Sequence, residues 1–246
     1  MGQHGRDLGA AAGGLHLHDD LGVLESLLDG LDPREPWTDV TPVRDALRDR
    51  LRADDRGVAG IRLVEAVERA WPADGALVVD MCVAGYWLAG YAVQSRPRRM
   101  AYPVGWGTLG FSLPAAIGPA SAGLPTLAVC GDGGAMFAIG ELATYQQERL
   151  PITLLIHDDG GYGMLRYDQQ VFGHPERGVD LATPDWLALA ASFGIAGAAV
   201  AGFGDELEEA LRFALAHNLS GAPAVVLVRG ALHPPRTTSP RWNEDM

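Results

Sequence analysis

Two acidic residues in glycine-rich turns are the part of this sequence best suited to chemistry. Asp132 lies within the glycine run at 131–134, and Asp159 directly precedes Gly160 and Gly161. Glycines allow backbone N–H groups to approach an anion closely. A carboxylate in such a turn repels phosphate unless a cation lies between them, and Mg²⁺ commonly shares its coordination sphere between carboxylates and phosphate oxygens. The two turns therefore predict a metal-bridged diphosphate site.

The segments around these turns read as two strands joined by a helix. Residues 126–130 and 152–156 are short apolar runs typical of buried strands. Between them, residues 135–147 carry Met136, Ile139 and Ala143 at helical spacing. Parallel strands joined in this way end at the same edge of a sheet, and ligands of open α/β sheets bind at that edge. Both acidic turns are expected there, with the N-terminus of the helix directed at the anion.

The rest of the chain continues the alternation of helices and strands. Helices are expected at 43–52, 62–71, 111–121, 186–193 and 205–218, the last capped by Asp205, and further strands at 76–80, 195–201 and 222–229. This order predicts the α/β class: a doubly wound, mostly parallel sheet of about six strands with helices on both faces.

Composition excludes several classes of function. The formal net charge of −12 argues against non-specific nucleic-acid binding. Cys82 and Cys130 are too few for a disulfide framework and are expected to be buried free thiols. No membrane span or signal peptide is visible, so we expect a cytoplasmic protein without membrane contacts. No nucleotide-binding glycine motif follows a strand, which disfavours a nucleotide-binding α/β protein.

The two acidic turns resemble the diphosphate-binding motif of thiamine-diphosphate-dependent enzymes, which is Gly-Asp-Gly, a spacer and a paired Asn. The resemblance spans about residues 60–230 and is greatest to the acetolactate synthase-like enzymes of 2-oxo acids. It implies a thiamine-diphosphate-binding fold with thiamine diphosphate and Mg²⁺ as cofactors. It also implies that Asp132, Asp159 and the backbone carbonyl of Gly161 are the metal ligands.

Further cofactor contacts follow from the same resemblance. The carbonyl of Gly107 would meet the aminopyrimidine, Leu109 would hold the cofactor bent, and Met164 would line the thiazolium pocket. The alternative for Leu109 is an ordinary core residue. The full expected set is Gly107, Leu109, Gly131, Asp132, Gly133, Gly134, Asp159, Gly161, Tyr162, Gly163 and Met164.

The chain departs from the family pattern at several positions. Asp158 and Asp159 stand where the family usually has two Asn. The added charge attracts the metal and repels the diphosphate, each by about 4 kcal/mol at 4 Å and an effective dielectric constant near 20, so the sequence leaves open which effect dominates. Val83 and Ala84 replace polar side chains near the diphosphate, and Asp168 lies where a substrate-site Trp is expected. Arg166 and the residues after it either face a substrate or partner or form a solvated helix start.

The resemblance also implies a domain organisation. Residues 1–55 are expected to be an N-terminal extension and linker, either packed on the main domain or a remnant of a middle domain. Residues 56–232 form the thiamine-diphosphate/Mg-binding domain, and 233–246 a flexible tail. The Glu that activates the cofactor in this family belongs to a pyrimidine-binding domain, for which this chain has no room. Glu141 is on the diphosphate side and cannot replace it, so no catalytic residue is expected here.

The functional expectation is therefore one subunit of a split enzyme. A separate pyrimidine-domain chain would complete it as a dimer or hetero-tetramer that decarboxylates a small 2-oxo acid and then ligates the product. The chain alone would be inactive. Two alternatives stay open: a subunit of a simple 2-oxo acid decarboxylase, and a non-catalytic binding or regulatory module.

Overall fold

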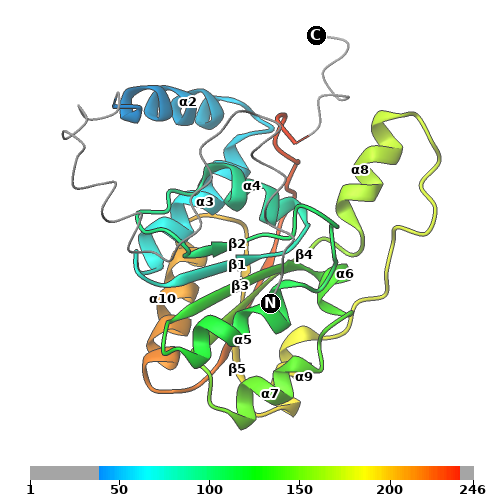
Figure 1. Ribbon diagram of the computed structural model, residues 1–246. Coiled ribbons are helices and arrows are strands. Elements are labelled where there is room, and N and C mark those ends of the chain that lie inside the picture. Colours follow the sequence, from blue (N-terminus) through cyan, green and yellow to red (C-terminus); the bar gives the residue numbers. More distant parts are fainter. Residues whose placement is uncertain (1–38, 239–246) are drawn as a thin grey trace, which may run out of the picture. The chain divides into compact units, whose positions relative to one another are not determined.

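A six-stranded sheet, parallel throughout, forms the centre of the structure (Figure 1). The computed structural model describes residues 39–238. The strands are β1 Ala76–Val79, β2 Met100–Ala101, β3 Thr126–Gly131, β4 Ile152–Asp158, β5 Ala196–Ala201 and β6 Ala224–Arg229, in the order β2-β1-β3-β4-β6-β5. The predicted fold class is confirmed; only the two-residue strand β2 was not foreseen.

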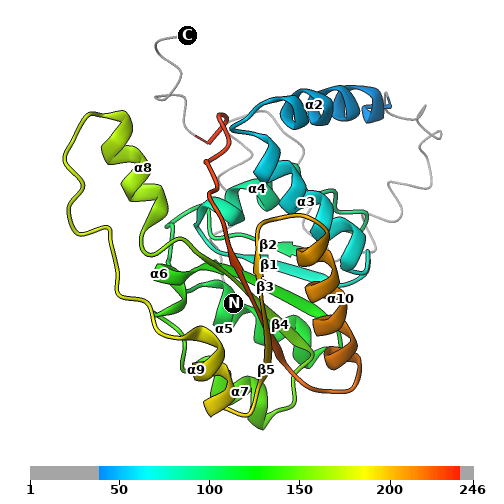
Figure 2. The same cartoon turned by 180° about the vertical axis from the view of Figure 1, so that it is seen from behind.

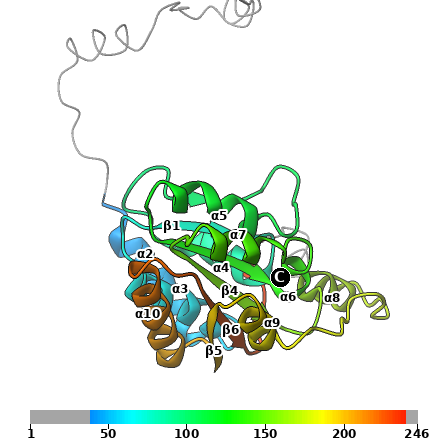
Figure 3. The same ribbon diagram turned by 90° about the horizontal axis from the view of Figure 1, so that it is seen from below.

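Helices cover both faces of this sheet. Successive apolar side chains of β3 point to opposite faces, so both faces need an apolar cover. Leu127 and Val129 face one hydrophobic cluster, while Ala128 and Cys130 face the other. The first cluster includes residues of α3, α4 and α10, and the second residues of α5, α7 and α9. Figure 3 shows α3 and α10 on one side of the sheet and α5 and α7 on the other, and α10 packs across β5 and β6 (Figure 2). The helices are α2 Thr41–Ala53, α3 Val58–Ala70, α4 Val83–Tyr91, α5 Ser112–Ser121, α6 Asp132–Ala135, α7 Glu141–Gln147, α8 Gly163–Val171, α9 Trp186–Ser192 and α10 Asp205–Leu219.

The strand order reverses direction between β1 and β3. From β1 the chain continues to β2 on one side, whereas β3 is followed by β4 on the other side. Such a switch point leaves a crevice beyond the carboxyl ends of the strands, which is where open α/β sheets bind ligands. The ends of β1, β3 and β4 therefore define the edge at which a site is expected.

Two predictions of local helix structure are wrong. The single helix expected over 135–147 is interrupted, because residues 136–140 form turns between α6 and α7. Phe137 N–H, for example, bonds to the carbonyl of Gly134, three residues back rather than four. Met136 is also largely exposed rather than part of an apolar face. The cap expected from Asp205 is likewise absent, since Gly204 is the N-cap residue and no side chain caps α10.

The ends of the described segment modify the expected domain picture. The chain divides into two compact units, Met1–Pro42 and Val43–Met246, and the predicted extension up to residue 38 lies outside the described residues. At the other end, the first part of the predicted tail contacts the domain: Trp87 donates to the carbonyl of His233 (2.7 Å), and Pro234 is buried. Trp87 itself is a core residue. Within residues 39–238, none of the helices has the length and apolar character that crossing a bilayer requires.

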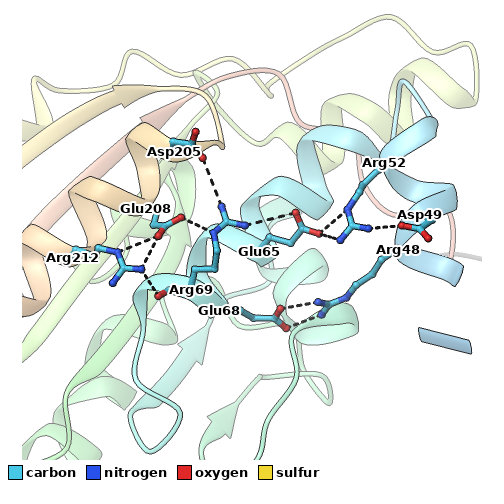
Figure 4. A network of polar contacts seen from close by, with 9 residues as sticks. All are labelled: Arg48, Asp49, Arg52, Glu65, Glu68, Arg69, Asp205, Glu208 and Arg212. Atoms are coloured by element: carbon cyan, nitrogen blue, oxygen red, sulfur yellow. Dashed lines mark hydrogen bonds and ion pairs between the residues drawn. The ribbon is translucent and has the colours of Figure 1, made fainter. Parts of the chain in front are cut away.

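An ion-pair network joins α2, α3 and α10 (Figure 4). Its least exposed pair is Arg48 with Glu68, two parallel bonds of 2.9 and 2.7 Å. The same groups bind the chain after α4, because Arg48 donates to the carbonyl of Tyr91 and Glu68 accepts from Val93 N–H. Glu68 therefore connects three segments.

We expect Glu68→Gln to lower the free energy of unfolding by about 1–3 kcal/mol, because it leaves a partly buried arginine without its carboxylate. Urea denaturation followed by circular dichroism measures this change. The control is Arg44→Gln, which removes an exposed pair with Asp45 and should change stability by about 0.5 kcal/mol or less. Equal effects of the two substitutions would contradict the connecting role of Glu68.

Candidate functional site

Three aspartates follow the carboxyl ends of β1, β3 and β4. Asp80 comes directly after β1, Asp132 follows the last residue of β3, and Asp159 follows the last residue of β4. Asp80 and Asp132 are fully buried. Since β1 pairs with β3 and β3 with β4, all in parallel, the three carboxylates lie at neighbouring strand ends. The edge predicted from sequence is therefore acidic.

The carboxylate of Asp132 is buried, and the rest of the described chain offsets its charge only weakly. Both of its oxygens are inaccessible and have no hydrogen-bond partner among residues 39–238. Burial, and after it the charge of Asp159, raises the pKa of Asp132 to about 6. A buried unpaired carboxylate costs several kcal/mol unless a proton or a cation neutralises it. A buried carboxylate without a partner is therefore suited to bind a metal ion.

The second turn brings further oxygen atoms to the same place. Asp159 Oδ1 is also buried without a hydrogen-bond partner in the described segment, and burial raises the pKa of this carboxyl. The carbonyl oxygen of Gly161 lies 3.1 Å from the position that a Cβ on Gly133 would occupy, so it adjoins the Asp132 turn. Two carboxylates and a backbone carbonyl are hard oxygen donors, which suit Mg²⁺.

This donor set leaves most of a metal's coordination sphere to a ligand. No group of three or more His, Cys, Asp or Glu side chains able to hold a metal occurs between residues 39 and 238. Mg²⁺ is usually bound through one or two carboxylates together with water and substrate phosphates, rather than by an all-protein cage. The residues present therefore fit a Mg²⁺ ion that is completed by a diphosphate.

The two aspartates of the Asp158–Asp159 pair have different surroundings. Asp158 is nearly buried and forms an ion pair with Arg229 Nε (3.0 Å) at the end of β6. Asp159 has Arg166 Nη1 at 3.9 Å from Oδ1. Each of the two charges that replace the family's Asn pair thus has an arginine nearby, which reduces the repulsion of a diphosphate.

All eleven residues predicted to bind the cofactor line one cavity of about 250 Å³. Its wall contains the two acidic turns just described and also apolar side chains, among them Val83, Leu109, Met164 and Leu165. Leu109 is only partly buried and faces this cavity, rather than being an ordinary core residue. A wall with both acidic and apolar groups suits a ligand that combines a metal-bound anionic group with an apolar part.

Asp80 supports the cavity wall, and this role was not predicted from the sequence. Its carboxylate accepts hydrogen bonds from Gly110 N–H (2.6 Å) and Met81 N–H (2.9 Å), which fixes the loop that carries Gly107 and Leu109. Gly134 also approaches it closely, because a Cβ there would lie 2.8 Å from Asp80 Oδ2. An acidic residue directly after a buried strand on the same edge as Asp132 was the signal available in the sequence.

Other parts of the cavity wall were also not foreseen. Both cysteines are free thiols, and Cys130 is buried as expected. Cys82 was also expected to be buried but is partly exposed and lines the cavity. Its Sγ accepts a hydrogen bond from Gly85 N–H. His157 lines the cavity and contacts the carbonyl of Gly230. Burial lowers the pKa of His157, so a neutral ring is expected there. The helix α6 is a single turn, so its dipole is smaller than that of the long helix predicted.

The pKa of Asp132 predicts a pH-dependent metal affinity. Because burial raises this pKa to about 6, protons compete with the cation increasingly below that pH, and Mg²⁺ affinity should fall as pH decreases from 7.5 to 5. In the metal-free protein the folded state holds this proton more tightly than the unfolded state, so the contribution of Asp132 to stability falls as pH rises from about 4 to 6. Calorimetric titration of Mg²⁺ at several pH values tests the first prediction, and equal affinity at pH 5 and 7.5 would contradict it. Urea denaturation of the metal-free protein and of Asp132→Asn at pH 4 and 7 tests the second, and the same pH dependence in both proteins would contradict it.

Fold and site together define an α/β protein whose strand switch point carries oxygen ligands suited to a metal–diphosphate group. Comparisons with known proteins show the family to which the chain belongs. Residues 80–228, more than half of the chain, match the family described as thiamine pyrophosphate enzyme, C-terminal TPP binding domain. The chain belongs to this family, and the predicted resemblance is confirmed.

The matched relatives are thiamine-diphosphate-dependent enzymes. The chain is 36% identical over 130 residues to the acetolactate synthase isozyme 2 large subunit of Escherichia coli, covering 51% of this chain and 24% of that protein. It is 32% identical over 202 residues to the benzoylformate decarboxylase of Pseudomonas aeruginosa, covering 79% and 36%. Among solved structures, a thiamine diphosphate-dependent 4-hydroxybenzoylformate decarboxylase from Rhodococcus jostii matches with a TM-score of 0.63 and 25% identity, covering 74% of this chain and 34% of that one. The chain thus spans 24–36% of the length of these relatives.

Proposed function

We propose that this chain is the diphosphate-binding subunit of a thiamine-diphosphate-dependent enzyme that decarboxylates a small 2-oxo acid and ligates the product. One observation carries the proposal: the buried, unpaired carboxylate of Asp132 lies beside Asp159 in a cavity whose wall also has apolar side chains. When bound, thiamine diphosphate supplies the electron sink that loss of carbon dioxide from a 2-oxo acid requires.

The chain's own residues have positional and electrostatic roles in this proposal. Asp132, Asp159 and the carbonyl of Gly161 would hold Mg²⁺, and Mg²⁺ would bind the diphosphate. Glycine N–H groups of the 131–134 turn would donate to phosphate oxygens without steric hindrance. Leu109 and Met164 would contact the organic part of the cofactor and exclude water from it. The acid–base group that activates the cofactor would come from elsewhere.

We further propose that this group belongs to a pyrimidine-binding domain on a separate chain. The rim of the cavity supports a partner there. Trp106, next to Gly107, is 92% exposed, and Leu165, a cavity-lining residue, is 52% exposed. Phe137 is 65% exposed, and its Cβ lies 3.0 Å from the position that a Cβ on Gly110 would occupy. Exposed apolar groups around a binding cavity are typical of a surface that another protein covers.

The proposal is tested by calorimetric titration of thiamine diphosphate into the full chain, with Mg²⁺ or with EDTA, and with or without a pyrimidine-domain protein. Saturable binding that requires Mg²⁺ is expected, whereas thiamine monophosphate, which lacks the second phosphate, should bind far more weakly. Absence of binding with and without the partner would favour a non-catalytic module.

A second assay separates decarboxylation from ligation. The assembled complex is incubated with pyruvate as the probe, and carbon dioxide and condensed products are both measured. Condensed product formed in proportion to carbon dioxide supports carboligation. Carbon dioxide with free aldehyde alone would instead identify a simple decarboxylase, the activity class named for the benzoylformate decarboxylase relative.

A further inference from the structure

The turn that carries Asp159 and Gly161 is covered by a short segment further along the chain. Residues 179–181, here called the strap, form an antiparallel bridge with this turn between Gly161 and Asp180. Tyr162 N–H donates to the carbonyl of Val179 (2.8 Å), and Leu181 N–H donates to that of Gly160 (2.9 Å). The side chain of Val179 is 2% exposed, so it anchors the strap in the interior.

The side chain of Arg166, on α8, links the strap to the turn. Its guanidinium donates to the carbonyls of Asp159 (3.2 Å) and Gly160 (3.3 Å) and to Asp180 Oδ1 (2.9 Å). The planar guanidinium has several donors in a fixed geometry, so one side chain can hold two carbonyls and a carboxylate at once. Arg166 therefore limits movement of the backbone that carries the proposed metal ligands.

The fit between the strap and the turn leaves no spare space. A Cβ on Gly161 would lie 1.9 Å from the carbonyl oxygen of Val179 and 2.8 Å from Arg166 Nη2. The backbone at Gly161 is thus enclosed by the strap and by Arg166, while its own carbonyl adjoins the Asp132 turn through Gly133. The strap and Arg166 therefore fix the direction in which the Gly161 carbonyl points.

We propose that Arg166 and the strap are positioning elements that select Mg²⁺ over Ca²⁺ at the site. Mg²⁺ requires a nearly ideal octahedron at 2.0–2.1 Å, whereas Ca²⁺ accepts irregular coordination at 2.3–2.6 Å. A turn held rigidly by outer contacts can meet the stricter requirement, and a loosened turn can still bind Ca²⁺. The inference rests on the proposed metal site of Asp132 and Asp159, and it extends that site to residues that do not touch the metal.

The test compares Mg²⁺ and Ca²⁺ affinities of the full chain by calorimetric titration in the presence of thiamine diphosphate. For Arg166→Gln we expect Mg²⁺ affinity to fall about tenfold or more, as typical for loss of an outer contact at a metal site, with Ca²⁺ affinity changed by about threefold or less. The control is Arg177→Gln, an exposed arginine in the loop after α8, which removes the same charge and should leave the Mg²⁺/Ca²⁺ ratio unchanged.

A second variant protects the test against misfolding. The side chain of Asp180 is 77% exposed, so Asp180→Asn should fold normally while weakening the link to Arg166. We expect a smaller fall in the Mg²⁺/Ca²⁺ ratio, about threefold. If both variants keep the wild-type ratio while the wild type binds Mg²⁺, the strap is only structural and the inference is wrong. If the wild type binds no Mg²⁺, the proposed site itself fails, and the inference with it.

Discussion

Replacing Asp132 by alanine is expected to abolish Mg²⁺-dependent binding of thiamine diphosphate while leaving the chain folded. The substitution removes a proposed metal ligand, and we expect the apparent affinity to fall roughly 100-fold or more. Calorimetric titration measures this. The nearly isosteric Asp132→Asn should raise the unfolding free energy of the metal-free protein by about 1–3 kcal/mol, because it removes a buried charge whose oxygens have no partner in the described chain.

The opposite signs of these two effects make the prediction specific. A merely structural aspartate would lower stability when replaced, and a surface aspartate would change neither quantity. The matched control is Asp205→Asn, whose side chain is 97% exposed and which should alter both by amounts close to zero. If Asp132→Ala still binds the cofactor in a Mg²⁺-dependent way, Asp132 is not a metal ligand.

The second large effect is expected at Gly163, which lies against the other proposed carboxylate ligand. A Cβ there would be 1.8 Å from Asp159 Oδ2, so Gly163→Ala must displace either the carboxylate or the start of α8. We expect cofactor binding in the presence of Mg²⁺ to weaken at least roughly tenfold, and stability to fall by about 1–3 kcal/mol from overpacking. Calorimetric titration and urea denaturation measure the two changes.

Gly90→Ala controls for the general effect of alanine replacing glycine. Gly90 is exposed in α4, and a Cβ there meets no atom of the described residues within 4 Å. This variant should keep its cofactor affinity and gain up to about 1 kcal/mol from higher helix propensity. Unchanged cofactor affinity in Gly163→Ala would show that Asp159 is not held as the geometry indicates.

The sequence predicted the position of the two acidic turns because they lie within one local unit. Strand, helix and strand between Thr126 and Asp158 bring the Asp132 and Asp159 turns to one edge by chain geometry alone. The apolar runs and the glycines were enough to place both turns. The roles of the eleven cavity-lining residues as cofactor ligands stay predictions, although the structure brings all of them together.

What the sequence did not predict depends on contacts between distant segments. The role of Asp80 depends on Gly110, thirty positions away, and the strap reaches Gly161 from Asp180. Neither contact has a local pattern. The expected helix over 135–147 failed because helical spacing ignores the low helix propensity of Gly134 and Gly140, and the chain instead turns between them.

The sequence also could not predict whether the charges of Asp158 and Asp159 are compensated. Their compensation comes from Arg229 on β6 and Arg166 on α8, and only the fold brings those side chains to the turn. We expect the site to accept a diphosphate because each added charge has an arginine nearby.

The central claim is that the carboxylates of Asp132 and Asp159 jointly bind a cation that in turn binds a diphosphate. Anomalous diffraction from crystals of the full chain grown with Mn²⁺ and thiamine diphosphate tests it most directly. The account predicts a single strong manganese peak between the two carboxylates, within bonding distance of the Gly161 carbonyl and of two phosphate oxygens. A cofactor bound elsewhere, or a manganese peak absent from the ends of β3 and β4, would contradict it.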